Sequence, residues 1–335
     1  MKRIENLTQD SGWGCTIRSA QMLIGNTLLF KHFEKDYPRE LILKLFDDSS
    51  RGIQESTFSI QNVCYQALES QGKVPGEWFG VGAMTKILEE LNDRFHPVQN
   101  FEICVFDENL IGQRILGKGL AQVDEMCSSQ FSFEQQSMSF DFKSTRFNQS
   151  QPQLGQAQEM TWKNSVLVII NLRLGAELIQ PEYAKVLTRY IKLPWFTGFI
   201  GGQPGKAFFF LGSNEKELIF LDPHLVQTYR PFSTENIEKI IDNSIPYKIS
   251  TKVENFGVRV INPDKLDPGV GLSFYIKSEE DYIMLIETLK GMSIEDGENA
   301  IFQVFQTEAE MNEALELGQS KLSIRSFSTF SQIKH

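Results

Sequence analysis

Cys15 stands between a turn-rich segment and a strongly amphipathic one. Residues 10–14 (DSGWG) are turn formers, and apolar residues then recur at helical spacing, at Ile17, Ala20, Leu23, Ile24 and Leu28. A cysteine in the first turn of a helix faces unpaired backbone N–H groups and the positive end of the helix dipole, which both favour the thiolate. The pattern predicts a helix that begins at a nucleophile, with an ordinary buried cysteine as the alternative.

A catalytic cysteine needs a base within hydrogen-bond reach and a group that holds this base in the right tautomer. Asp222 and His224 follow an expected strand at residues 217–221 and lie two residues apart, so their side chains should project to the same face. An Asp-Pro-His triplet alone is usually a turn. Together with the Cys15 segment, it predicts a thiol enzyme that uses cysteine, histidine and aspartate.

The other histidines fit the role of base less well. His32 falls at the late, solvent-facing end of the first expected helix, His96 precedes a proline, and His335 is the last residue. His224 is therefore the preferred base.

Composition bounds the remaining functions. A hydrophobic content of 41% over 335 residues supplies a sizeable core, and the longest apolar run, 166–170, is far too short to span a bilayer. The formal charge of −10 argues against a nucleic-acid surface or a polybasic membrane patch, and favours a protein partner. The four cysteines show neither a CxxC pair nor metal-ligand spacing with the histidines, so no metal, cofactor or disulfide framework is expected. Reduced thiols and a polar start without a signal-peptide core favour the cytoplasm.

Periodicity predicts the elements that must position these side chains. Helices are expected near 15–33, 39–46, 56–70, 85–95, 108–116, 181–192, 234–241 and 279–289, and strands near 101–106, 166–174, 207–211, 217–221, 258–261, 272–276 and 300–304. Helices come first and an antiparallel sheet second, which favours an α+β enzyme over a βαβ nucleotide binder. Residues 128–160 are rich in Ser, Gln and Phe and are expected to form a mobile surface insertion. The glycine-rich loop 72–84 carries Trp78 and Phe79, which indicates either a lid at a binding edge or simple packing.

Five segments then carry a resemblance to a known family. DSGWGC, GEWFGVGAMTKILEEL, LVIINLRLG, FIGGQPGKAFFFLG and ELIFLDPH occur in this order, and GLSFYIKSEEDY follows near the end, so that the similarity runs from about residue 8 to about residue 305. They resemble the successive motifs of the autophagins, cysteine proteases of autophagy that process and delipidate Atg-eight-type ubiquitin-like modifiers. The resemblance implies a papain-like fold and a single catalytic domain over 1–335, with a small helical lobe at about 39–117 and a tail at about 307–335.

The same resemblance implies a role for each candidate residue. Cys15 is the nucleophile, His224 the base and later the acid, and Asp222 the group that orients it. Trp78 and the loop formed by Gly201, Gly202, Gln203 and Pro204 cover a narrow channel for an extended substrate tail around a glycine. The implied partners are the modifier and its phosphatidylethanolamine conjugate, with no nucleic acid and with membrane contact only through the substrate.

Two departures from the family pattern leave alternatives open. Only fourteen residues precede Cys15, and the upstream tyrosine proposed to assist the oxyanion in the family is absent. Gln9 lies six residues before Cys15, the spacing at which papain-like proteases place their oxyanion glutamine, so its amide is a possible donor; alternatively, it is an ordinary loop residue of a truncated chain. The alternative function is that of a non-catalytic homologue, which binds the modifier without cleaving it. The second departure is the tail, which is less like the family, although residues 330–333 (FSQI) fit an aromatic-x-x-aliphatic modifier-binding pattern.

Overall fold

The computed structural model describes residues 9–33, 39–48, 56–120, 161–214, 216–224 and 259–317. Within this part of the chain, seven strands form a mixed sheet in the order β1-β3-β8-β4-β5-β6-β7. They are β1 (Phe101–Asp107), β3 (Ser165–Arg173), β4 (Phe196–Gln203), β5 (Lys206–Ser213), β6 (Leu218–Leu221), β7 (Arg259–Ile261) and β8 (Gly269–Ile276). The β1–β3 pair is parallel and the other neighbouring strands are antiparallel. The short strands β2 (Asn109–Ile111) and β9 (Gln303–Phe305) form a separate parallel pair.

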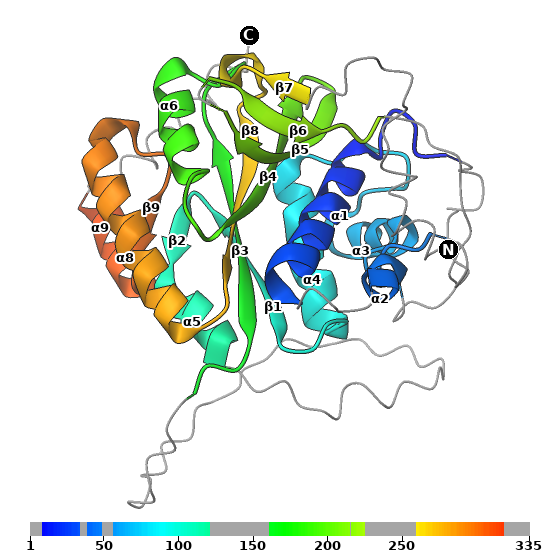
Figure 1. Ribbon diagram of the computed structural model, residues 1–335, viewed down its shortest axis with the longest axis horizontal. Helices are drawn as coiled ribbons and strands as arrows, with labels where there is room; N and C mark the ends of the chain where they lie inside the picture. The colour runs from blue at the N-terminus through cyan, green and yellow to red at the C-terminus, as the bar shows by residue number, and fades with distance from the viewer. Residues whose placement is uncertain are drawn as a thin grey trace, which may run out of the picture.

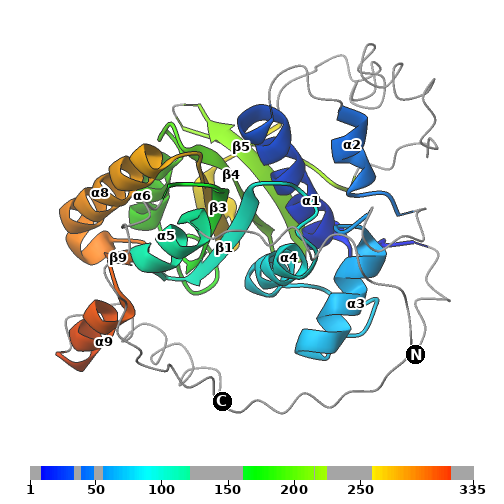
Figure 2. The same ribbon diagram turned by 90° about the horizontal axis from the view of Figure 1, so that it is seen from below.

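Helices cover both faces of the large sheet (Figures 1 and 2). On one face lie α1 (Cys15–Thr27), α3 (Ile60–Gln71) and α4 (Val81–Phe95), with the short α2 (Arg39–Lys44) beside them. On the other face lie α5 (Gly112–Leu120), α6 (Pro181–Tyr190) and α8 (Glu279–Asp296), followed by α9 (Glu308–Glu316). The fold is therefore α+β and papain-like, as the sequence predicts.

Strand β3 divides the hydrophobic core into two clusters. Val166, Val168 and Ile170 pack with the cluster of α5, α6 and α8, whereas Leu167 and Ile169 pack with that of α1, α3 and α4. A strand that is buried on both faces needs apolar residues at every position. This explains why residues 166–170 of the predicted strand form a continuous apolar run and not an alternating pattern.

Helix α1 is held against strands β4 and β5. Its buried side chains include Ile17, Ala20, Leu23 and Ile24, which repeat at the spacing of one helical face. Near its C-terminal end, Asn26 Nδ2 donates to the Thr197 carbonyl of β4 at 2.8 Å. The helix continues as a π-helical turn, η1 (Leu28–His32). The sheet thereby fixes the position of α1, and with it the Cys15 end.

Two predictions about the elements need correction. The helix expected at 108–116 is strand β2 followed by α5, which begins only at Gly112. The loop expected at 201–204 consists, in its first three residues, of the end of strand β4, for which no strand was expected. Strand β1, which falls within the small helical lobe expected at about 39–117, pairs with β3 in the main sheet.

The hairpin expected at 207–211 and 217–221 is confirmed by the antiparallel pairing of β5 with β6. The part of the tail that the structure describes contains helix α9. The expected insertion at 128–160, the helix at 234–241 and the motif at 330–333 lie outside the described residues.

Candidate active site

Cys15 is the first residue of α1, as the sequence predicts. Gly14 is the N-cap residue and makes no side-chain cap, and the Cys15 thiol is free and partly exposed. Among the residues that the structure describes, none accepts a hydrogen bond from the Cys15 backbone N–H. An open N–H beside the sulfur can donate a hydrogen bond to the oxyanion that forms on a substrate carbonyl oxygen when this sulfur attacks it.

The turn before Cys15 is tied to the body of the protein. The Asp10 carbonyl accepts from the backbone N–H of Trp13 at 3.2 Å and of Gly14 at 2.8 Å. Arg18 reaches back from α1 and pairs with the Asp10 carboxylate and with the Asp48 carboxylate, each at 2.7 Å. The Trp13 ring is buried, and these bonds therefore define where the backbone of Cys15 lies.

Gln9 stands at the start of this turn and is exposed. Its carbonyl accepts from the Trp13 indole Nε1–H at 3.3 Å. No hydrogen bond from its side-chain amide is found within the described part of the chain, so the amide is available as a donor.

Asp222 and His224 form a hydrogen-bonded pair directly after β6. Asp222 Oδ1 lies 2.7 Å from His224 Nδ1 and also accepts the His224 backbone N–H at 2.9 Å. The side chain of Asp222 is 12% exposed and that of His224 is 36% exposed. A carboxylate on Nδ1 leaves Nε2 with its lone pair, which is the arrangement of a general base.

Strand β5 lies between the nucleophile helix and this pair. Phe209 of β5 belongs to the hydrophobic cluster of α1. The next ring, Phe208, points to the other face and contacts His224 edge-on, with ring centroids 5.8 Å apart. In the view of Figure 1 the chain after β6 runs toward the N-terminal end of α1. Within the described residues, no hydrogen bond joins Cys15 to His224, so the structure pairs histidine with aspartate but not with the thiol.

Trp78 lies in the loop before α4 and is 44% exposed, whereas its neighbour Phe79 is fully buried. Trp78 lines a cavity of about 500 Å³ together with the start of α4, the ends of β1 and β3, and the start of β8. Arg173, Asp267 and Asn171 are among the polar residues of its wall. Phe79 therefore packs in the core, whereas Trp78 borders the cavity.

The expected loop at Gly201–Pro204 is the end of a strand and a tight turn. Gly201, Gly202 and Gln203 belong to β4, and Pro204-Gly205 connects Gln203 to its partner Lys206. Gly205 has φ +76°, which suits the third position of a type II turn after proline. The Gly202 carbonyl accepts from the backbone N–H of Asp267 at 2.8 Å, and Asp267 also lines the Trp78 cavity. The hairpin and Trp78 therefore border the same region.

His32 is partly buried instead of lying at a solvent-facing helix end. Its ring packs against Phe33 and Phe101, and its Nδ1 lies 2.9 Å from the Tyr275 hydroxyl. Burial lowers the pKa of His32 to about 4. His96 pairs with Glu102 at 3.3 Å. The His32 ring is therefore packed in the core, and the His96 ring is paired with a carboxylate of β1.

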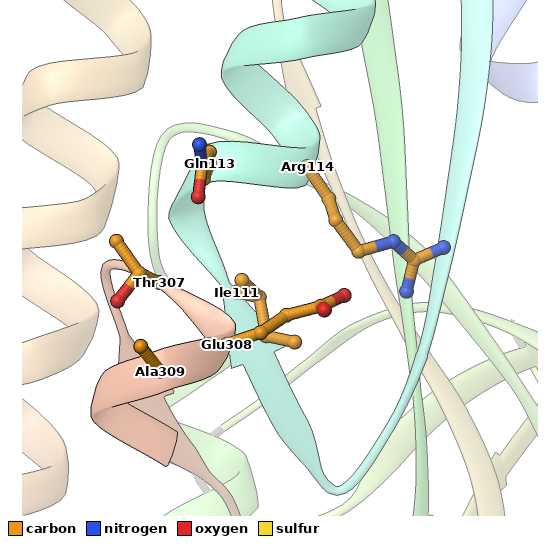
Figure 3. A pocket seen from close by; sticks show the side chains of 6 residues that line it. All are labelled: Ile111, Gln113, Arg114, Thr307, Glu308 and Ala309. Atoms are coloured by element: carbon orange, nitrogen blue, oxygen red, sulfur yellow. The ribbon is translucent and has the colours of Figure 1, made fainter. Parts of the chain in front are cut away.

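A second cavity of about 500 Å³ lies where α5 meets the start of α9. Figure 3 shows the side chains of Arg114 and Glu308 extending to the same side of the cavity. Its walls contain no thiol and no imidazole. In the described ranges, no cluster of metal-ligating residues is found, and no helix is long and apolar enough to cross a membrane.

A thiol at a helix start and a histidine–aspartate pair after a strand of the adjacent sheet are the groups that a papain-like cysteine peptidase uses. The family model for the Peptidase C54 catalytic domain matches residues 1–288, and the chain belongs to this family of autophagy cysteine proteases. It is 29% identical over 290 residues to the human cysteine protease ATG4A, a match that covers 82% of this chain and 66% of the relative. It is 28% identical to the cysteine protease ATG4B of Oryza sativa subsp. japonica, with 82% of this chain and 54% of the relative covered. The chain thus spans between about half and two-thirds of these relatives.

Proposed function

We propose that the protein cleaves after the C-terminal glycine of an Atg-eight-type ubiquitin-like modifier. It would process the modifier precursor and release the modifier from phosphatidylethanolamine. The observation that carries the proposal is the 2.7 Å Asp222–His224 pair, which sits on the sheet against which the Cys15 helix packs. Membership of a cysteine peptidase family supports it.

His224 Nε2 would take the proton of the Cys15 thiol, and the thiolate would attack the carbonyl carbon after the glycine. The oxyanion would accept a hydrogen bond from the Cys15 backbone N–H and a second one from the Gln9 side-chain amide. The protonated His224 would then give its proton to the leaving amine, of a peptide or of phosphatidylethanolamine, as the C–N bond breaks. A water molecule activated by the same imidazole would hydrolyse the thioester and restore the thiol.

Trp78 and the hairpin at Gly201–Pro204 would form the walls of the channel for the substrate tail. Only glycine has no β-carbon, so an extended chain with glycine at the cleaved bond can pass between close walls. The exposed Trp78 ring and the Asp267 bridge between its cavity and Gly202 support this assignment. The proposed place of action is the cytoplasm, with membranes reached only through the lipidated substrate.

A gel assay with purified protein and a modifier precursor tagged at its C-terminus tests the proposal. Wild-type protein should release the tag, whereas Cys15→Ala should abolish cleavage and keep modifier binding, because it removes the nucleophile and little volume. Cys64→Ala is the matched control, since Cys64 is a buried core thiol. Binding without cleavage by the wild type would support the non-catalytic rival instead.

The oxyanion role of Gln9 is separable in the same assay. Gln9→Ala keeps the Gln9 carbonyl and therefore the bond to Trp13. A fall in kcat of ~10²-fold at unchanged stability is expected for the loss of one oxyanion donor. An unchanged kcat would assign Gln9 to the loop alone.

A further inference from the structure

The second carboxylate oxygen of Asp222 has a partner of its own. Oδ1 is occupied by the ring and backbone N–H groups of His224, and Oδ2 accepts from Arg259 Nη1 at 2.5 Å. Each carboxylate oxygen of Asp222 therefore has its own partner: Oδ1 binds His224, and Oδ2 binds the permanently charged guanidinium of Arg259.

Strand pairing explains how Arg259 reaches this site. Strand β7 pairs antiparallel with β6, and Arg259 stands directly opposite Phe220. Residues directly opposite each other point to the same face, and so do residues two apart on one strand. Phe220 and Asp222 are two apart, so the long side chain of Arg259 extends past Phe220 to the carboxylate.

We propose that Arg259 is a positioning residue of the active site, which holds the plane of the Asp222 carboxylate so that Oδ1 stays aimed at His224 Nδ1. The inference rests on the proposed function of Asp222 and His224. The terminal torsion of an aspartate side chain is broad, so a carboxylate held only by histidine can rotate, and the ring can follow it. A displacement of about 1 Å in a reacting group can cost up to ~10²-fold in rate.

The effect should appear in catalysis and not in stability. The side chain of Arg259 is 46% exposed, and surface ion pairs contribute about 0–1 kcal/mol to folding. Arg259 touches neither Cys15 nor the Trp78 cavity in the described contacts, so substrate affinity should be preserved.

Cleavage kinetics of Arg259→Gln and Arg259→Lys test this role, with Arg94→Gln as the control. Arg94 pairs with Glu69 at 2.6 Å and is 47% exposed, which matches Arg259 in geometry but lies on α4. Arg259→Gln should lower kcat by ~10-fold with KM within ~2-fold, and Arg259→Lys should recover part of the loss because it keeps the charge. Arg94→Gln should behave as the wild type. An unchanged kcat, a change confined to KM, or no rescue by lysine would overturn the proposal.

A double-mutant cycle with Asp222→Asn completes the test. If Arg259 acts through Asp222, adding Arg259→Gln to Asp222→Asn should cause little further loss, whereas multiplying losses would refute the inference. The alkylation rate of Cys15 by iodoacetamide gives the same comparison without any modifier. If Cys15→Ala and Asp222→Asn leave cleavage intact, the proposed function fails. If Cys15→Ala abolishes cleavage and Asp222→Asn lowers its rate, but Arg259→Gln does not reduce it, only the inference fails.

Discussion

Replacing Gly14 by alanine should displace Cys15 without altering the thiol. A β-carbon at Gly14 would lie 2.5 Å from Asp10 Cβ and 2.7 Å from Asp10 Oδ2, far closer than the ~3.5 Å of a normal carbon contact. Asp10 is itself held, because its carboxylate binds Arg18 and its carbonyl accepts the Gly14 N–H. The strain must therefore move the turn, the start of α1, or both.

The size of the effect follows from these contacts. Forcing an extra methyl group into a packed site costs ~1–3 kcal/mol. Loss of the Arg18–Asp10 pair, whose side chains are 28% and 34% exposed, adds at most ~1 kcal/mol. A total of ~1–4 kcal/mol corresponds to a fall in Tm of about 1–6 °C for a chain of 335 residues. Because Gly14 is bonded to Cys15, a shift of about 1 Å at the sulfur should also lower kcat by ~10- to 100-fold.

Thermal unfolding and cleavage kinetics measure both quantities. Gly291→Ala is the control, because a β-carbon there meets no atom within 4 Å. In an Asp10→Gly background, which removes the obstructing side chain, Gly14→Ala should cost much less. A Gly14→Ala protein with wild-type Tm and kcat would refute the argument that this turn fixes the position of Cys15.

Three further predictions concern the site and its surroundings. Trp78→Ala should lower kcat/KM by at least ~10-fold, equivalent to ~1.4 kcal/mol, with little change in Tm because the ring is half exposed; unfolding with normal activity per folded molecule would make it a packing residue. Iodoacetamide should label Cys15 before Cys64 and Cys104, because burial raises the pKa of both buried thiols to about 12, and peptide mapping would reveal any other order. The pKa of His32 is about 4 in the folded protein and 6.5 as its ordinary value, so the unfolded state binds more protons between these pH values. The free energy of unfolding should therefore fall as the pH drops from 6.5 to 4. His32→Gln should reduce this loss by ~1–2 kcal/mol, which would appear as a shallower dependence of Tm on pH. An unchanged dependence of Tm on pH would contradict the assignment.

Local patterns predicted those parts of the fold that depend on one segment. The helix that begins at Cys15 and the doubly buried strand β3 have strong periods of their own, and both are confirmed. Strand β4 was missed because its glycines resemble a loop. Gly202 is required there by a distant contact, since a β-carbon would lie 1.8 Å from the Lys206 carbonyl oxygen. Turn-like composition in this segment therefore reflects close packing of two backbones.

In the candidate site too, a contact between near neighbours in the sequence could be predicted, whereas a contact between distant residues could not. Asp222 and His224 are two residues apart, and their pairing could be predicted from strand geometry alone. Arg259 lies 37 residues beyond Asp222, and only the pairing of β7 with β6 brings it there. No spacing rule in the sequence links such a residue to the triplet.

Strand β5 lies between the proposed nucleophile, Cys15, and the proposed base, His224, which are far apart in the sequence. Its alternating rings face two directions: Phe209 packs in the cluster of α1, which carries Cys15, and Phe208 contacts the His224 ring. Strand β6 pairs with β5, and β7 pairs with β6. The Asp222–Arg259 contact is therefore connected to β5 through these two strand pairings. Because interiors are densely packed, a strand buried between two such contacts transmits displacement from one side to the other. The register of β5 therefore links the position of α1, through Phe209, to that of the His224 ring, through Phe208.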